Sequence, residues 1–371
     1  MAILVSSQND WCTCSQSRLY LQISSAYGSS TATHCLQVTQ YQLSASLLNT
    51  FSSYCDKWKL NINFDKTKIM VFGDRNGRKR DIRVNGNSLE IVDSFKYLGV
   101  VFSKNRKFAL AKKHVVEQAR KALFSLLKKI RNLDLSVDCQ LKFFDQTVLP
   151  IITFNCDIWA IGDLSMSEKI HTDFMKQILH VKRSTPHVML YGDLGRFPIS
   201  ITIKKRIVSF RCNLISSNNK LSSLIYQFIY SDSINNNYPR PYSWLHTVKS
   251  IIDECGLSYV WLNQNFHGTK SSFLHEVENS LKNQYIQSWQ AEINTSQKCL
   301  NYKIFKTEHK LEHYFDILPL TYIQTFVNYR MGNNRFPIET GRWQNVPRHE
   351  RKCIFCTSNE IGDAFHYLFN C

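Results

Sequence analysis

The chain lacks an apolar run of the roughly 20 residues that a membrane-spanning helix needs, so the sequence predicts no transmembrane segment. Its amino terminus also lacks the positively charged flank of a secretory signal. We therefore expect the 12 cysteines to be reduced and the protein to be nuclear or cytoplasmic. No internal repeat at a fixed period is present, which argues against solenoid and propeller folds.

Acidic residues are scarce. The 371 residues contain 29 Asp and Glu against 46 Lys and Arg, which gives a formal net charge of +17. This balance favours a polyanionic partner, most simply RNA or DNA. Two adjacent aspartates, which could hold a pair of catalytic metal ions, occur nowhere in the chain. The length and a hydrophobic content of 43% are sufficient for two or three domains with sizeable cores.

The first hundred residues show the pattern of a sheet backed by a helix. Apolar residues three and four apart predict a helix over about 44–58. Alternation over Leu60–Phe64 predicts a half-buried strand, and the continuous apolar run Ile69–Phe72 predicts a covered one. Asn85-Gly86, between two short apolar runs, predicts a hairpin. Residues 97–102 predict a further buried strand that contains a glycine.

These elements resemble the downstream half of the palm in reverse transcriptases of non-LTR, LINE-type retrotransposons. The resemblance rests on Tyr54–Phe72 and on Lys96-Tyr97-Leu98-Gly99 with its following apolar residues. In that family an apolar strand directly follows a turn with two metal-binding aspartates, and Met1–Ser7 resembles that strand. The resemblance implies that the catalytic Asp-Asp turn and the ligands for Mg²⁺ are missing, so that no catalytic residue is expected.

The resemblance also suggests roles for individual residues. It places Lys66 or Lys68 near the phosphates of the incoming nucleotide, and it makes Tyr97, Leu98 and Gly99 the hairpin that grips the primer terminus. The alternative for both lysines is that they are solvated flanks of a strand.

Residues 11–42 differ from their surroundings because they are rich in Ser, Thr and Gln, with Arg18 as the one charged residue. The family has only a short turn here, so we interpret the segment as an insertion with a loose loop. A metal site made of Cys12, Cys14, His34 and Cys35 is the alternative, but its spacing is poor.

The segment Lys104–Arg131 contains ten Lys and Arg residues and a single acid, Glu117. An apolar stripe at helical spacing predicts one helix here. Its bases lie mostly off the stripe and are Lys112, Lys113, Arg120, Lys121, Lys128 and Lys129. A solvated surface helix is the ordinary explanation, but pairing within the helix cannot neutralise so many bases. We therefore expect the helix to bind a phosphate backbone without sequence preference.

The rest of the chain is predicted to be mostly helical. Helices are expected at Ser136–Leu149, Ser167–Val181, Ile199–Ser216, Ser243–Cys255, Ser271–Asn294 and Tyr314–Arg330, with a loop over 186–198. Pro150 and the acid-x-Trp pair Asp157–Trp159 resemble the thumb of the same family, with Trp159 as a core residue. The predicted domains are a partial palm over 1–103, a helical thumb over 104–216, a linker over 217–242 and a helical C-terminal region over 243–371.

The last feature is Cys353-x2-Cys356-x9-His366-x4-Cys371. Three thiolates and an imidazole at this spacing suit a tetrahedral zinc site. The motif also resembles the Cys-Cys-His-Cys segment near the end of many LINE-type reading frames. The neighbouring bases Arg348, Arg351 and Lys352 would place it against nucleic acid. The alternative is a set of reduced core cysteines with an incidental histidine.

The sequence therefore predicts an α+β protein with a partial palm sheet, a helical thumb and a helical C-terminal region that ends in a zinc-binding segment. The favoured function is that of a truncated reverse-transcriptase-like protein that binds nucleic acid, such as an RNA or a primer-template, without polymerase activity. The alternatives are a non-functional retroelement fragment and an unrelated basic, α-helical, zinc-containing scaffold that binds nucleic acid.

Overall fold

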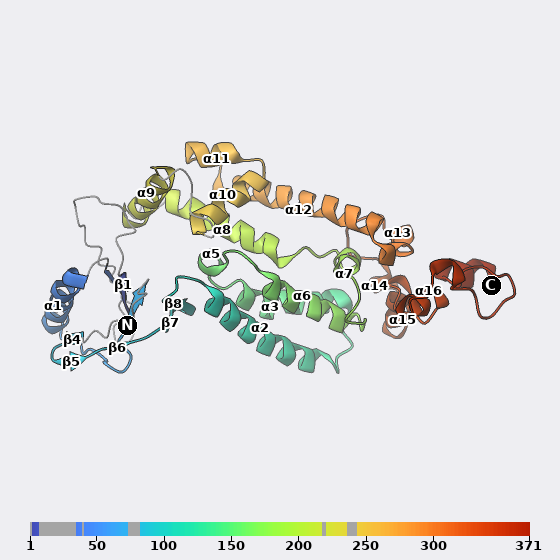
Figure 1. The fold of residues 1–371 in the computed structure, drawn as a ribbon, viewed down its shortest axis with the longest axis horizontal. Helices are drawn as coiled ribbons and strands as arrows, with labels where there is room; N and C mark the ends of the chain where they lie inside the picture. The colour runs from blue at the N-terminus through green and yellow to red at the C-terminus, as the bar shows by residue number, and fades with distance from the viewer. Residues whose placement is uncertain (1, 7–34, 39–40, 73–81, 217–219, 236–242) are drawn as a thin grey trace. The chain divides into compact units, whose positions relative to one another are not determined.

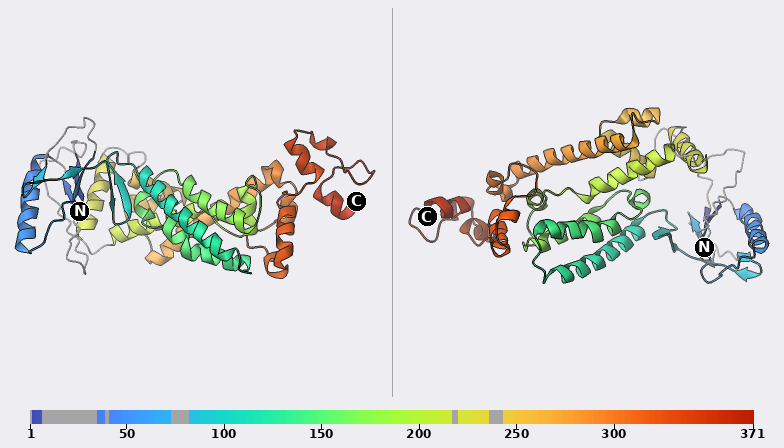
Figure 2. Two further views of the ribbon diagram at one scale, coloured as in Figure 1. Left: turned by 90° about the horizontal axis from the view of Figure 1, so that it is seen from below. Right: turned by 180° about the vertical axis from the view of Figure 1, so that it is seen from behind.

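The computed structural model describes residues 2–6, 35–38, 41–72, 82–216, 220–235 and 243–371. These residues form two compact units. Unit 1 comprises Met1–His114 with Phe228–Tyr238, and unit 2 comprises Val115–Gln227 with Pro239–Cys371. Helices dominate and the strands are short (Figure 1 and Figure 2), as expected of an α+β fold. Within these ranges no helix is both long enough and apolar enough to span a membrane.

Unit 1 contains a four-stranded sheet in the order β2-β1-β3-β6. Its strands are β1 (Ala2–Ser6), β2 (Cys35–Val38), β3 (Lys68–Phe72) and β6 (Glu90–Ile91). Each neighbouring pair is parallel. Because parallel strands need a crossover, the chain passes from β2 to β3 through helix α1 (Tyr41–Lys57). The predictions of a helix near 44–58 and of a strand at Ile69–Phe72 are confirmed.

Two antiparallel hairpins complete unit 1. In the first, Asn85-Gly86 joins β4 (Arg83–Val84) to β5 (Asn87–Ser88), as predicted. Both turn residues have positive φ, 50° and 77°, as a type I′ turn requires. In the second, Leu98-Gly99 joins β7 (Ser94–Tyr97) to β8 (Val100–Ser103). The prediction of one strand over 97–102 is wrong, because the chain reverses direction at this turn.

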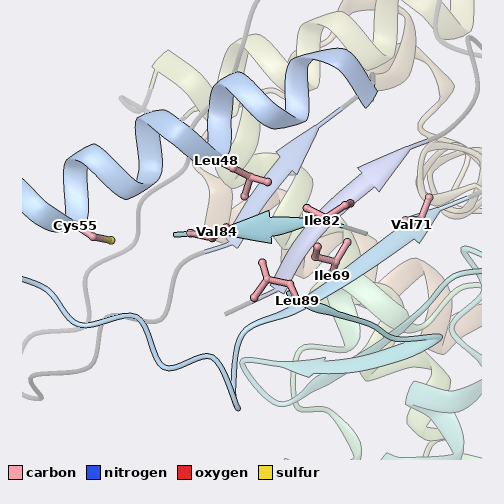
Figure 3. Close-up of a cluster of buried hydrophobic side chains, with 7 residues drawn as sticks. All are labelled: Leu48, Cys55, Ile69, Val71, Ile82, Val84 and Leu89. Carbon is pink, nitrogen blue, oxygen red and sulfur yellow. The ribbon is translucent and has the colours of Figure 1, made fainter. Parts of the chain in front are cut away.

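The core of unit 1 lies between α1 and the strands (Figure 3). Two residues of α1 pack with two residues of β3 and with three residues of the segment around the first hairpin. They are Leu48, Cys55, Ile69, Val71, Ile82, Val84 and Leu89. Burying these side chains stabilises the unit by about 25 cal/mol for each Å² of apolar surface that is removed from water.

The prediction of a strand over Leu60–Phe64 is wrong. Its apolar side chains are half-buried against the core while Asn61 and Asn63 are exposed, so the alternation reports burial without strand pairing. A turn then leads into β3, because the Asn63 side chain accepts a 3.0 Å hydrogen bond from the amide of Lys66. The hydroxyl of Thr67 donates to the Asn63 carbonyl at 2.7 Å.

The predicted loop over 11–42 is also partly wrong. Residues 35–38 form β2, which pairs with β1, and α1 begins at Tyr41. Residues 11–34 and 39–40 lie outside the described residues, as do Cys12, Cys14 and His34 of the alternative metal site.

Unit 2 is built from helices, of which α2 begins in unit 1 and α9 ends in unit 1. In chain order they are α2 (Ala109–Ile130), α3 (Val137–Thr147), α4 (Leu149–Ile152), α5 (Cys156–Trp159), α6 (Ser165–Ile178), α7 (His187–Asp193), α8 (Ile199–Ile215), α9 (Lys220–Asn235), α10 (Trp244–Glu254), α11 (Ser258–Asn263) and α12 (Lys270–Thr295). Ser136, Ser243 and Thr269 cap α3, α10 and α12 through their side-chain oxygens, which satisfies amides that a helix start leaves free.

Helix α8 is central to the packing of unit 2 because it contacts α5, α6, α10 and α12. Helix α12 runs alongside it (Figure 1). Trp159 at the end of α5 is fully buried and donates from Nε1 to the Phe154 carbonyl at 2.7 Å. The prediction that Trp159 is a core residue is confirmed.

Three other predictions for this part of the chain need correction. The expected loop over 186–198 contains α7, whose residues are almost all buried. The linker expected over 217–242 contains α9, so its described residues are helical. The helix expected over Tyr314–Arg330 is two helices, α14 (Tyr314–Ile317) and α15 (Leu320–Arg330). They are interrupted at Pro319, since a proline disfavours helical backbone in the residue before it.

Short elements make up the C-terminal region. Besides α14 and α15 they are α13 (Tyr302–Phe305), α16 (Pro337–Trp343), the 3₁₀ turns η1 (Gln297–Cys299) and η2 (Arg348–Glu350), and the π turn η3 (His366–Asn370). The fully buried Asp193 of α7 joins this region to the helices before it. Its carboxylate accepts hydrogen bonds from the hydroxyls of Tyr302 and Tyr314, at 2.7 and 2.8 Å, and from the guanidinium of Arg330 at 3.2 Å.

Candidate metal centre and basic helix

Four side chains converge at the C-terminal end of unit 2. The Sγ atoms of Cys353, Cys356 and Cys371 and a ring nitrogen of His366 all lie within 4.8 Å of one another. The sulfurs of Cys353 and Cys371 are 3.9 Å apart, and the Cys356 sulfur is 3.2 Å from Nε2 of His366. The structure thus brings together all four residues that the sequence predicts as metal ligands.

The local backbone explains this convergence. Lys352 and Ile361 form an antiparallel bridge, and the amide of Cys353 donates to the carbonyl of Glu360 at 2.9 Å. This pairing closes the loop that carries both Cys353 and Cys356. The other two ligands lie at the two ends of η3, where the amide of Cys371 donates to the carbonyl of His366 at 2.8 Å. The i to i+5 spacing of a π turn places both ends on one side.

The separation of two of the sulfurs fits a tetrahedral metal ion. Bonds of about 2.3 Å from zinc to sulfur give a tetrahedron edge of about 3.8 Å, close to the 3.9 Å between Cys353 and Cys371. A disulfide, with a bond of about 2.05 Å, is excluded, and the three cysteines are free thiols. Sulfur and imidazole donors suit zinc better than magnesium or calcium. The cluster could therefore hold a metal ion, and its donor set is that of a structural zinc site.

Glu360 orients the histidine. Its Oε2 is 2.8 Å from Nδ1 of His366 and accepts a hydrogen bond from Nδ2 of Asn370 at 3.3 Å. A carboxylate at Nδ1 favours the tautomer that protonates this nitrogen, which leaves Nε2 free to bind a metal ion. Metal-ligating histidines commonly have such a partner on the second nitrogen. The His366 side chain is almost completely buried, while Glu360 is half-exposed.

The protonation states of the cluster follow from its hydrogen bonds. Burial opposes ionisation of the Cys353 thiol, but the amide of Phe355, 3.3 Å from the sulfur, helps to lower its pKa to about 6. The hydrogen bond with Glu360 raises the pKa of His366 to about 9. Burial and the neighbouring Cys353 raise the pKa of Cys371 to about 11. A metal ion that binds here at neutral pH must displace protons.

The second predicted site is the exposed face of α2. Ala119, Leu123, Leu126 and Ile130 point into unit 2 and are buried. Arg120, Lys121, Lys128 and Lys129 are exposed, as is Arg131 just beyond the helix. Within the described chain none of these five cations has an ion pair, and the acid Asp138 of α3 is already paired with Lys142 at 2.6 Å. This cluster of five residues is called the α2 basic face below.

The predicted bases nearer the start of α2 lie in unit 1, where Lys113 is exposed and Lys112 is half-buried. The single acid of the segment, Glu117, is exposed on the helix between these bases and the α2 basic face. From there to Leu133 the chain contains no acid, so the positive charge is greatest in the second half of the helix.

The three bases near the metal cluster differ from one another. Arg348 is exposed on η2. The guanidinium of Arg351 donates to two backbone carbonyls, those of Val346 at 2.8 Å and Ile338 at 3.0 Å. The ammonium of Lys352 donates to the carbonyl of Asn359 at 2.8 Å. Two of the three predicted nucleic-acid contacts therefore stabilise the C-terminal fold.

The remaining predicted residues lie in unit 1. Lys66 is exposed in the turn before β3, and Lys68 begins β3 and pairs with Glu90 across the sheet at 2.5 Å. Leu98 and Gly99 form the tip of the β7–β8 hairpin, directly after Tyr97. Leu98 is 69% exposed and has a φ of 45°, a left-handed conformation that is uncommon for a leucine.

Two important acids are not evident from the sequence. Glu360 precedes the histidine of the motif by six residues, and its contact with Nδ1 is set by the fold of the intervening segment, which the sequence pattern does not predict. Asp193 lies in the segment predicted as a loop. Its role depends on two tyrosines and an arginine that follow more than a hundred residues later.

Comparison with known proteins finds a partial match. The RNA-directed DNA polymerase from mobile element jockey of Drosophila melanogaster is 25% identical over 154 residues. The match covers 40% of this chain but only 16% of that protein. It supports a distant relationship to retrotransposon reverse transcriptases, which confirms the resemblance in this coarser form. No protein-family model matches the chain. No solved structure matches it either.

Proposed function

We propose that this chain is a reverse-transcriptase-related protein that binds nucleic acid through the α2 basic face and does not by itself synthesise DNA. The observation that carries the proposal is the set of five exposed cations, Arg120, Lys121, Lys128, Lys129 and Arg131, without an ion pair among the described residues. The distant similarity to a retrotransposon polymerase supports the same class of partner.

The charge of the α2 basic face favours a polyanionic partner for a physical reason. Lys128 and Lys129 lie in the last turn of α2, where cations interact favourably with the helix dipole. That effect does not extend to Arg120 and Lys121, which lie more than a turn earlier. The like charges repel one another, and a phosphate backbone would replace this repulsion with attraction while it releases counterions.

We do not propose polymerase activity, because the chain contains no pair of adjacent aspartates that could hold two metal ions. Polymerases of this class position two divalent metal ions with carboxylates. Asp10, Asp56, Asp65, Asp74 and Asp93 are separated along the sequence, and no two aspartates of the chain are adjacent.

The Cys3His cluster extends the proposal. We propose that Cys353, Cys356, His366 and Cys371 hold a zinc ion that fixes the fold of the C-terminal segment. Such an ion supplies folding free energy where the core is small. The apolar side chains around the cluster are largely exposed: Ile354, Phe355, Phe365 and Phe369 are each more than half exposed. A bound ion would compensate for the burial that this segment lacks.

Salt-dependent binding tests the proposal. The test variant replaces Arg120, Lys121, Lys128 and Lys129 with glutamine. The control replaces Lys104, Lys204, Lys249 and Lys310 with glutamine. All four form ion pairs away from the α2 basic face, so the control removes the same charge. Binding to a fluorescent oligonucleotide is measured between about 50 and 200 mM salt.

We expect the test variant to bind more weakly and to lose about 3 units of the slope of log affinity against log salt, since each phosphate contact contributes about 0.7 for a single strand. The control should keep the slope of the natural protein. Equal losses in both variants would show that net charge alone attracts the nucleic acid. An absence of binding by the natural protein at low salt would refute the proposal.

A further inference from the structure

Phe124 lies in the middle of the α2 basic face. It is 64% exposed, while its neighbours Leu123 and Leu126 are buried. One helical turn before it are Arg120 and Lys121, and one turn after it is Lys128, so the ring is flanked by cations on both sides along the helix. Within the described residues no aromatic ring or cation contacts Phe124.

A single exposed apolar side chain is common on protein surfaces. The surroundings of Phe124 are what distinguish it, because the long cationic side chains leave the flat ring accessible at the centre of a positively charged strip. Arg120 and Lys128 are separated by eight residues, or about 12 Å along the helix axis. A base on the ring would therefore lie between two groups that can hold its flanking phosphates.

We infer that the α2 basic face binds single-stranded nucleic acid, with Phe124 as a platform on which one unpaired base stacks. The inference rests on the proposed function and narrows its ligand from nucleic acid in general to the single-stranded form. Proteins that bind single strands without sequence preference combine a cationic track with aromatic stacking positions. The α2 basic face contains both components on one helix.

A double helix fits this arrangement less well. In a duplex each base is stacked on both sides, so a phenylalanine gains a base face only by opening a base step, which costs free energy. In a single strand the base face is available without that cost. The cations would serve either ligand, so the aromatic ring is the group that discriminates between them.

Binding to three oligonucleotides tests the inference. The probes are an oligothymidylate, an abasic strand with the same number of phosphates, and a duplex of the same length. The variant Phe124→Leu keeps an apolar side chain of similar size and removes the ring, whereas Phe124→Tyr keeps a ring. Phe143→Leu on α3 is the matched control because Phe143 is also exposed, at 38%.

We expect Phe124→Leu to bind oligothymidylate about tenfold more weakly and to bind the abasic strand and the duplex as the natural protein does. Phe124→Tyr and Phe143→Leu should bind all three probes normally. The salt slope should be unchanged in every one of these variants, since no cation is removed. Circular dichroism should confirm that they fold, because the Phe124 ring is mostly outside the core.

Several results would overturn the inference. They are unchanged binding of oligothymidylate by Phe124→Leu, an equal loss on the abasic strand, or tighter binding of the duplex by the natural protein. If the α2 charge variant loses binding while Phe124→Leu does not, only this inference fails and the proposed function stands. If the natural protein binds none of the probes, both fail.

Discussion

The C-terminal cluster and the α2 basic face are two candidate sites built on opposite physical arrangements. In the cluster, four ligand atoms from separate positions in the sequence lie within 4.8 Å of one another and converge on one point. On α2, five cations of one short segment are directed outward, and none has an ion pair among the described residues.

The difference shows how each site could recognise its ligand. Convergent ligands select by geometry, because an ion of the wrong size or coordination leaves thiolates unsatisfied. A row of exposed cations selects by charge and weakens as salt is added. We therefore expect the two sites to be independent, with the cluster sensitive to single atoms and the α2 basic face sensitive to total charge.

The largest effect is expected from removal of one ligand in the cluster. Cys356→Ala should lower zinc affinity by about 10²- to 10³-fold, since the roughly 10–16 kcal/mol of a structural zinc site is shared by four ligands. Competition with a chromogenic chelator measures this. Cys139→Ala on α3, outside the cluster, should bind zinc normally. Retention of full affinity by Cys356→Ala would show that Cys356 is not a ligand.

Charge reversal on α2 is expected to have the next largest effect. The double variant Arg120→Glu and Lys128→Glu should bind nucleic acid about 10²-fold more weakly at low salt, because two attractive contacts become repulsive. The difference should shrink as salt screens the charges. Zinc affinity should not change.

The control for this reversal is Lys298→Glu with Lys303→Glu, two exposed lysines elsewhere in unit 2. This pair changes the net charge by the same amount and should weaken binding much less. Equal weakening in the two double variants would contradict a localised site on α2. The nucleic acid would then be attracted by the net positive charge of the whole protein, in contrast to the localised metal cluster.

The two sites and the fold differ in how far the sequence predicts them. The cluster was predictable because ligand spacing is local, and the α2 basic face because charge and helical period are both visible in the sequence. The hairpin at Asn85-Gly86 was predictable for the same reason. The apolar pattern missed the Leu98-Gly99 turn, because leucine seldom adopts positive φ and the segment resembled an uninterrupted strand, whereas the family resemblance had placed a hairpin at Tyr97, Leu98 and Gly99.

The other errors involved tertiary structure. The alternation at Leu60–Phe64 describes burial correctly, but strand pairing depends on a neighbour that the pattern cannot supply. Helix α7 was missed because prolines bound its segment, which suggested a loop. The helix is also buried on nearly all sides, so it lacks the polar face that gives a surface helix its sequence period. The contacts of Arg351 with two carbonyls and of Glu360 with His366 depend on how turns bring distant atoms together.

The orientation of His366 by Glu360 provides a third, smaller test. Glu360→Ala should weaken zinc binding by about 10- to 100-fold, as expected for loss of the partner that orients a histidine ligand. Glu360→Gln should weaken it less, because the amide oxygen can still accept the hydrogen bond from Nδ1. Glu350→Gln, an exposed acid on η2, is the control. If Glu360→Gln is as damaging as Glu360→Ala, then the negative charge is what matters and not the orientation of the ring.

The smallest effect is expected from a comparison of Arg348 and Arg351, which have the same charge and lie three residues apart. Arg351→Gln should lower the free energy of unfolding by about 2 kcal/mol, because charged donors to two carbonyls are lost, whereas exposed Arg348→Gln should change it by less than about 0.5 kcal/mol. Urea unfolding at a fixed zinc concentration measures both. The salt slope of nucleic-acid binding should be unchanged by Arg351→Gln, because its guanidinium is already occupied within the protein. A lower slope without a loss of stability would show that Arg351 contacts nucleic acid, as is proposed for the cations of α2. The bases around the cluster would then bind an external ligand, and would not serve only to stabilise the fold.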